Sequence, residues 1–145
     1  STIFSNHYVM RFLFSSLGLS IILSVFISCR EIPEKCPEIK YDGNLTTLNG
    51  KPYSGSCSTD YKTGELNSIQ TYKLGIDHGK WTFYYKNGNL ETEGTFDMGK
   101  RVGLWKYYYE NGQVHKKNNY DPYGKPTSSW VTYDKKGSVL NEIQN

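Results

Sequence analysis

The sequence is short of aliphatic residues outside one N-terminal stretch, whereas aromatic residues are abundant in the remainder. Hydrophobic residues make up 37% of the chain, and because many of them fall in that single stretch, the rest cannot form a large core of leucine, isoleucine and valine. Aromatic side chains, at 15% of all residues, must take that place. They suit β-strands and bury large areas. At 145 residues the chain has room for one domain and little more.

A strong net charge is also missing. The formal net charge is only +3 and like charges do not gather in long blocks, which argues against a nucleic-acid partner. The sequence contains no His-x-x-x-His, Cys-x-x-Cys or Gly-x-Ser-x-Gly pattern. It therefore offers no basis for a metal site, a cofactor or a catalytic residue, and we expect a non-enzymatic protein.

Residues 1–28 end in the layout of a secretory signal. Arg11 precedes a long uncharged apolar run that closes with the small residue Ser28, directly before Cys29. The run is marginal in length for a membrane span, so we favour a cleaved signal helix over an uncleaved anchor. The residues ahead of Met10 are interpreted as upstream sequence.

The end of this run, Phe26-Ile27-Ser28-Cys29, resembles the lipobox of bacterial lipoproteins. The resemblance implies cleavage before Cys29 and a lipid such as palmitate on its thiol. Acyl chains would then hold the protein at a membrane, since each buried methylene contributes about 0.8 kcal/mol. The implied location is the bacterial outer membrane or cell surface. We divide the chain into the signal peptide at 1–28, a lipid-bearing tether at 29–48 and a domain at 49–145.

The two other cysteines, Cys36 and Cys57, suggest one disulfide in an exported protein, although two free thiols remain the alternative. A bond would close a loop of about 20 residues and add roughly 3 kcal/mol in the chain-entropy view. We expect such a bond to pin residues 30–48 over the first edge of the domain.

Past residue 48 the chain repeats itself. Gly64, Gly88, Gly112 and Gly137 are 24, 24 and 25 residues apart. Seven residues before each glycine stands one member of a second series, which is Cys57, Trp81, Trp105 and Trp130. Such a fixed period indicates one supersecondary unit that stacks on its neighbours.

Each unit is expected to be a β-hairpin. Alternation in residues 81–85 places Trp81 and Phe83 on one face and Tyr84 on the other. Asn87-Gly88 and Asn111-Gly112 predict two-residue type I′ turns, in which both residues need a positive φ. On the return strand, Glu93 is expected to face solvent.

Residues 99–103 are interpreted as a loop that leads to the next hairpin. The result is an all-β fold, a meandering antiparallel sheet of hairpins about 24 residues long.

Residues 79–88 and 103–112 resemble the bacterial variant of the MORN repeat, and the resemblance extends over residues from about 50 to 145. It implies a β-hairpin scaffold with a role in protein or membrane association. Some bacterial members carry an antitoxin label. The family brings no catalytic motif, and a fold by itself does not define a function.

The aromatic residues are the only feature with binding potential. Trp81 and Trp105 either form the core or contribute to a broad aromatic surface, and we favour the core. Tyr84 and Tyr108, on the reverse face, are then the candidate contact patch for a protein or a sugar. The expected function is a lipid-anchored binding scaffold for a protein or envelope component. The alternatives are a glycan-binding module and an antitoxin-like protein.

Overall fold

The computed structural model describes residues 32–143, which form strands and turns. No helix long and apolar enough to cross a membrane occurs in this part of the chain. The predicted signal helix and Cys29 lie outside the described residues. The strands are β1 (Ile39–Tyr41), β2 (Thr46–Leu48), β3 (Lys51–Pro52), β4 (Gly55–Asp60), β5 (Leu66–Lys73), β6 (Ile76–Asp77), β7 (Gly79–Tyr84), β8 (Leu90–Asp97), β9 (Lys100–Tyr108), β10 (Val114–Tyr120), β11 (Pro126–Tyr133) and β12 (Val139–Ile143).

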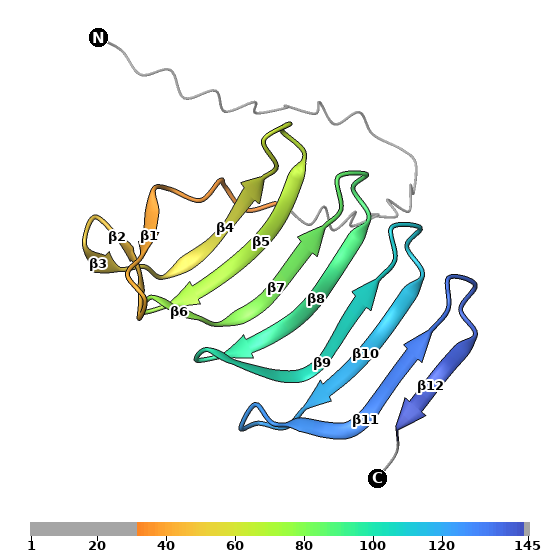
Figure 1. Ribbon diagram of the computed structural model, residues 1–145. Helices are drawn as coiled ribbons and strands as arrows, with labels where there is room; N and C mark the ends of the chain where they lie inside the picture. The colour runs from red at the N-terminus through yellow and green to blue at the C-terminus, as the bar shows by residue number, and fades with distance from the viewer. Residues whose placement is uncertain (1–31, 144–145) are drawn as a thin grey trace, which may run out of the picture. The chain divides into compact units, whose positions relative to one another are not determined.

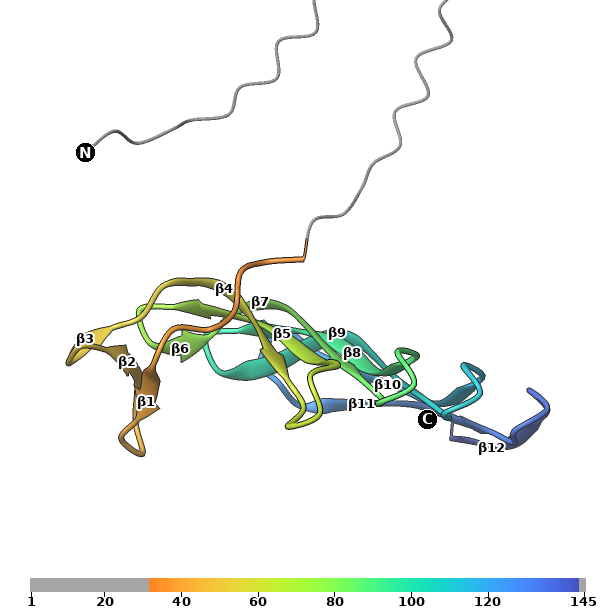
Figure 2. The ribbon, with the colours of Figure 1, turned by 90° about the horizontal axis from the view of Figure 1, so that it is seen from above.

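These strands form two antiparallel sheets. The small sheet has the order β1-β2-β3, and the large one runs β12-β11-β10-β9-β8-β7-β5-β4, with β6 paired to β5. Neighbours in sequence are thus neighbours in the sheet, as the row of strands in Figure 1 shows. Seen from above in Figure 2, the large sheet is a single curved layer. A lone hairpin is marginal in water, so the array gains its stability from neighbour contacts.

The predicted all-β meander is confirmed, but the predicted loop at residues 99–103 is wrong. Strand β9 begins at Lys100 and pairs directly with β8, from Asp97↔Lys100 onward. The connection between these strands is therefore the tight turn Met98-Gly99. Adjacent hairpins are therefore hydrogen-bonded to each other along their neighbouring strands, and the sheet is continuous.

The Asn-Gly turns are also not of the predicted type. Gly88 has a φ of 84°, but Asn87 does not share a positive φ. The Gly88 N–H donates to the Tyr85 carbonyl at 2.9 Å, and the Tyr85 N–H donates to the Asn89 carbonyl at 2.8 Å. This is a three-residue loop with glycine in the bulge position, which needs a left-handed residue only once.

Asparagine in these turns has a different role from the one predicted. The side-chain oxygen of Asn87 accepts the Asn89 N–H at 3.0 Å, while its amide donates to the Glu110 carbonyl in the next turn at 2.9 Å. Asn111 likewise donates to the Lys135 carbonyl at 3.2 Å. Asparagine is therefore used here to join adjacent turns, because its amide satisfies both a local and a neighbouring backbone group.

True two-residue turns, in which both central residues have positive φ, occur at the opposite end of the large-sheet strands at Leu74-Gly75 (53° and 79°) and Met98-Gly99 (44° and 82°). The small sheet has a turn of the same kind at Asn49-Gly50 (52° and 76°). At the third such position of the large sheet, after β10, one extra residue converts the turn into a three-residue loop closed by Gly124. The insertion at Pro122-Tyr123 is thus absorbed without changing the sheet.

Aromatic rings on one face of the sheet form a continuous ladder. Ring centroids are 5.8 Å apart for Tyr53–Tyr72, 5.4 Å for Tyr72–Trp81, 5.1 Å for Trp81–Phe96 and 5.0 Å for Phe96–Trp105, all with edge-on geometry. Trp81 and Trp105 are 9% and 1% exposed, as expected for core residues. Each edge-to-face pair adds about 0.5–1.5 kcal/mol beyond burial. The ladder therefore takes the place of the missing aliphatic core.

Trp105 fits into the ladder because Gly94 has no side chain. A Cβ on Gly94 would lie 2.1–2.6 Å from the indole ring of Trp105. The indole Nε1–H of Trp105 donates to the Thr95 carbonyl at 3.2 Å, and one repeat earlier that of Trp81 donates to the Thr71 carbonyl at 2.8 Å. Trp130 is only half-buried. Asn118 stands 24 residues after Gly94 and pairs with Trp130, so the position next to Trp130 carries a side chain where the position next to Trp105 has none.

Tyrosines at the start of each polar turn connect one hairpin to the next. The hydroxyl of Tyr61 donates to the Tyr84 carbonyl at 2.7 Å, and that of Tyr85 donates to the Tyr108 carbonyl at 2.8 Å. Tyr109 continues the series with the Tyr133 carbonyl at 3.0 Å. This repeated bond fixes the spacing of adjacent hairpins.

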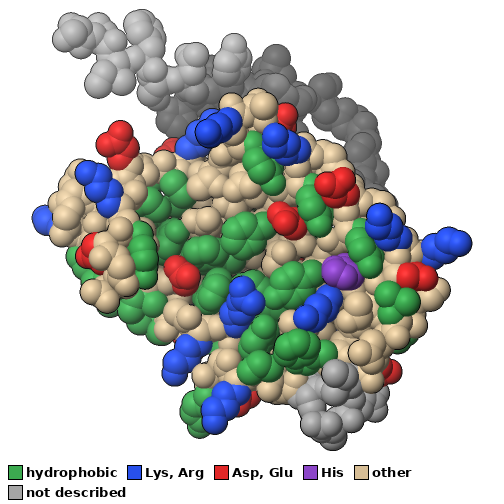
Figure 3. Space-filling view, in the orientation of Figure 1, with side chains coloured by type: hydrophobic (Ala, Val, Ile, Leu, Met, Phe, Trp, Pro, Cys, Tyr) green, Lys and Arg blue, Asp and Glu red, His purple; other side chains and the backbone are tan. Residues whose placement is uncertain are grey.

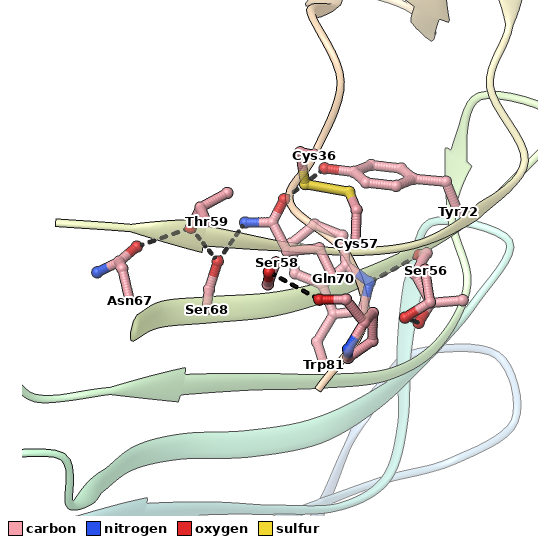
Figure 4. Close-up of a disulfide and its surroundings, with 12 residues drawn as sticks. Cys36, Ser56, Cys57, Ser58, Thr59, Asn67, Ser68, Gln70, Tyr72 and Trp81 are labelled. Carbon is pink, nitrogen blue, oxygen red and sulfur yellow. Dashed lines mark hydrogen bonds between the residues drawn. A yellow bond between two sulfur atoms is a disulfide. The ribbon is translucent and has the colours of Figure 1, made fainter. Parts of the chain in front are cut away.

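The first edge of the large sheet is covered by the preceding segment. Cys36 forms a disulfide with Cys57. Cys57 stands at the repeat position that tryptophan occupies in the later repeats, on the face that carries the aromatic rings. The Cys36 N–H donates to the Ser58 carbonyl at 2.7 Å, and the Ser58 N–H donates to the Glu34 carbonyl at 2.8 Å. Figure 4 shows the disulfide beside Tyr72 and Trp81. The predicted disulfide pairing is present, and residues 34–36 bond to the edge strand β4 at Ser58, which partly blocks pairing of this edge with another chain.

Candidate functional site

The two ends of the hairpins differ sharply in character. At one end the turns are polar, and they contain the glycines Gly64, Gly88, Gly112 and Gly137 together with lysine, asparagine, threonine or glutamate. At the other end the corresponding positions hold Leu74, Met98 and Tyr123, which are 61%, 42% and 76% exposed. Because alternate turns of a meander lie at the same end, these three residues follow one side of the sheet, at the turns β5–β6, β8–β9 and β10–β11 (Figure 1).

We call Leu74, Met98 and Tyr123 the apolar tip row. Each member is close in sequence to an exposed lysine, which is Lys73, Lys100 or Lys125.

Two members of the apolar tip row have an unfavourable backbone. Leu74 and Met98 have φ values of 53° and 44°, a region that L-residues other than asparagine, aspartate and glycine avoid. A left-handed residue with a Cβ costs about 1–2 kcal/mol. The equivalent turn before β3 uses Asn49, which tolerates this conformation better. Exposed apolar side chains in a strained conformation point to a use other than stability, since such strain is concentrated at functional positions.

Sequence reasoning missed the apolar tip row. The signal was present in the regular glycines Gly75, Gly99 and Gly124, each of which directly follows a large apolar residue. Treating residues 99–103 as a loop concealed that these residues form tight turns on one side of a sheet.

Tyr108, predicted as part of an exposed patch, is tied into a polar cluster. Its hydroxyl donates to Glu93 Oε1 at 2.8 Å, and Glu93 also pairs with Lys80 at 2.9 Å and Lys106 at 3.4 Å. The side chain of Glu93 is 18% exposed, so the prediction of a solvated Glu93 is wrong. A shallow hollow of about 240 Å³ adjoins this cluster.

Electrostatics keep Glu93 ionised. Burial alone would raise its pKa, but hydrogen bonds from Lys80 and Tyr108, the charge of Lys80 and a bond from Lys106 outweigh burial and lower the pKa to about 2. Burial and the bond to Glu93 raise the pKa of Tyr108 to about 12. Tyr84 is half-buried like Tyr108, and the role of both residues in binding remains a prediction.

Cations lie over two of the three tryptophan rings. The guanidinium of Arg101 is 4.5 Å from the ring centroid of Trp105, and Lys116 Nζ is 4.4 Å from that of Trp130. Arg101 also donates to the hydroxyl of Tyr107 at 3.2 Å. Such pairs contribute about 0.5–1 kcal/mol at exposed sites. Figure 3 shows hydrophobic side chains spread across one face, with charged side chains both among them and around them.

Within residues 32–143, no group of three or more histidine, cysteine, aspartate or glutamate side chains is arranged to hold a metal ion.

The arrangement of stacked antiparallel hairpins defines a β-hairpin repeat protein. A comparison with protein families matches residues 77–98 and 101–121 to the MORN repeat variant. The two matched segments correspond to the hairpins β7–β8 and β9–β10, where the repeat pattern is strongest. The predicted resemblance is thus confirmed for these two units. Searches of curated proteins and of solved structures found no match.

Proposed function

We propose that this protein is a non-catalytic, lipid-anchored scaffold of the bacterial envelope that docks another protein through the apolar tip row. The observation that carries the proposal is the recurrence of exposed Leu74, Met98 and Tyr123 at equivalent turns, two of them with strained backbones. Three large apolar side chains in the turns at one end of the strands form a surface that a repeat protein does not need for folding. The anchor at Cys29 rests on the sequence alone.

The chemistry of the partner follows from the neighbours of the apolar tip row. Lys73, Lys100 and Lys125 are exposed beside the apolar side chains, whereas of the aspartates near the same turns Asp77 and Asp121 are half-buried and Asp97 is exposed. A complementary surface carries apolar side chains with acidic groups between them. The match of two hairpins to MORN repeats supports a binding role of this general kind.

Site-specific crosslinking in intact envelopes tests the proposal. A photoreactive phenylalanine analogue in place of Tyr123 should give one discrete protein adduct, whereas the same analogue in place of Lys136, in an exposed polar turn at the opposite end, should not. Changing Lys100 to glutamate should reduce the adduct at position 123, and raised salt should do the same.

Two results would contradict the docking surface. Equal crosslinking from positions 123 and 136 would show that the apolar tip row has no special role. Adducts with lipid alone would assign the row to the bilayer instead. Mass spectrometry of the membrane form tests the anchor separately, because a lipid on Cys29 adds a defined mass.

A further inference from the structure

A cavity lies where the small sheet meets the turn end of the large sheet. Its volume is about 410 Å³, and its side-chain lining includes Tyr41, Asn44, Thr46, Tyr72 and Asp77. Ile76, Gly75 and Gly99 also line it, and each of the two glycines directly follows a residue of the apolar tip row. The cavity therefore adjoins the proposed docking surface.

Backbone hydrogen bonds fix the walls of this cavity. The Thr46 N–H donates to the Gly75 carbonyl at 2.8 Å, and the Gly99 N–H donates to the Asp77 carbonyl at 2.8 Å. On the opposite side, the carboxylate of Asp42 accepts the N–H groups of Asn44 and Leu45, both at 2.8 Å. A Cβ on Gly75 would lie 2.8 Å from the Thr46 carbonyl oxygen, so the two sheets approach closely here. The hollow is thus part of the folded structure.

Asp77 is the charged group of the cavity, and within the described part of the chain no cation or hydrogen-bond donor pairs with its side chain. The neighbouring Tyr72 hydroxyl donates to Gln70 instead, at 2.6 Å. Burial raises the pKa of Asp77. Burial and the nearby charge of Asp77 raise the pKa of Tyr72 to about 12. A half-buried carboxylate without a partner favours the arrival of a positive charge.

The next repeat carries a charge of the opposite sign at the position of Asp77. Asp77 lies opposite Tyr72 in the sheet, and the residues 24 positions later, Arg101 and Phe96, lie opposite each other in the same way. Arg101 extends its guanidinium over the ring of Trp105. The chain thus has a carboxylate at the position where the next repeat has a cationic side chain against an aromatic ring.

We propose that this cavity binds a lysine or arginine side chain of the docked partner, with its cationic end at the Asp77 carboxylate and its stem against Tyr41 and Tyr72. A basic side chain combines an apolar stem, which suits Tyr41 and Tyr72, with a cationic end, which suits the carboxylate of Asp77, and for this reason we assign it over a compact cation. Aromatic rings attract a cation on their faces, and their apolar bodies accept its methylene stem. The inference extends the proposed docking surface, because the cavity lies beside it.

Titration of the full chain with small probes tests the cavity without the partner. The cationic probes are the Nα-acetyl methylamides of lysine and arginine, and the matched neutral probe is the lysine compound acetylated on Nε. Two-dimensional ¹H–¹⁵N NMR should show saturable shifts at Gly75, Asp77 and Gly99 with the cationic probes and none with the neutral one.

Variants assign the effect to the cavity. Asp77→Asn should weaken binding of the cationic probes by about tenfold or more, since a hydrogen-bonded charge pair is lost. Tyr41 is 71% exposed, so Tyr41→Ser should leave the fold intact and weaken binding several-fold. Asp97→Asn, which removes an exposed carboxylate paired with His78 outside the cavity lining, should leave probe affinity unchanged.

Three results would overturn the assignment. They are equal binding of cationic and neutral probes, unchanged affinity in Asp77→Asn with the fold retained, and tighter binding of glucosamine than of either amino-acid probe. Probe binding at Asp77 without any protein adduct at position 123 would leave the cavity assigned and remove only the docking surface. A protein adduct at position 123 without probe binding would support the docking surface and remove the assignment of the cavity.

Discussion

Replacing Gly94 with alanine tests the aromatic ladder at its most crowded point. An added Cβ would lie 2.1, 2.2 and 2.6 Å from three carbon atoms of the Trp105 indole. Gly94 does not have a left-handed φ, so alanine suits the backbone and the effect is purely steric. Trp105 is 1% exposed, and to avoid the methyl group its ring must leave Phe96 and the carbonyl of Thr95.

The expected cost follows from that displacement. Overpacking typically costs about 1–3 kcal/mol, and loss of a buried tryptophan contact about 3–5 kcal/mol. We therefore expect Gly94→Ala to lower the free energy of unfolding by about 2–4 kcal/mol, close to the effect of Trp105→Ala.

Urea denaturation measures the loss, and tryptophan fluorescence should shift to the red as the ring becomes hydrated. Gly112→Ala is the matched control, because Gly112 has a φ of 83° and open space around its Cβ position. It should cost only about 1–2 kcal/mol from backbone strain. A loss in Gly94→Ala no greater than in this control would refute the account of the ladder.

Three further predictions follow from the repeat. Gly88→Val should destabilise the domain by about 1–3 kcal/mol, since a β-branched residue is forced to a φ of 84° although no atom lies within 4 Å of its Cβ; an unchanged melting temperature would contradict the bulge assignment. Tyr85→Phe should cost about 1 kcal/mol through loss of the bond to the Tyr108 carbonyl, seen in urea denaturation, and no loss would show that this bond is not needed. Because the pKa of Glu93 is lowered to about 2, its contribution is present above the ordinary glutamate value and is lost as pH falls from about 4.5 to 2. After allowance for screening it amounts to about 1–2 kcal/mol, so wild type and Glu93→Gln should differ in stability at pH 7 and converge near pH 2.

The sequence was sufficient to predict the sheet, but not the details of its turns. The 24-residue period identified the hairpins and placed Trp81 and Trp105 correctly, because alternation along a strand determines which face a residue occupies. The turn at Asn87-Gly88 was misassigned because the same dipeptide fits both a two-residue turn and a glycine bulge. The difference depends on where the strand ends, and that is set by pairing with the neighbouring strand.

The candidate sites were predicted less well for a related reason. Alternation put Glu93 on the outer face, but it could not show that Lys80 and Lys106 flank it from adjacent strands. The cavity at Asp77 depends on contact between residues of the small sheet and two turns of the large one, which no local pattern reveals. The pairing of Cys36 with Cys57 is predictable from the sequence, because Cys29 is interpreted as the lipid-bearing residue and two cysteines remain.

The most direct test of the proposed function compares stability and docking in one double variant, Leu74→Asn with Met98→Asn. Asparagine tolerates a positive φ and removes the apolar side chain, so we expect the unfolding free energy to rise by about 1 kcal/mol in total. We expect the protein adduct from position 123 to disappear in the same variant. Retained crosslinking, or lost crosslinking together with a less stable fold, would contradict the claim that these turns sacrifice stability for binding.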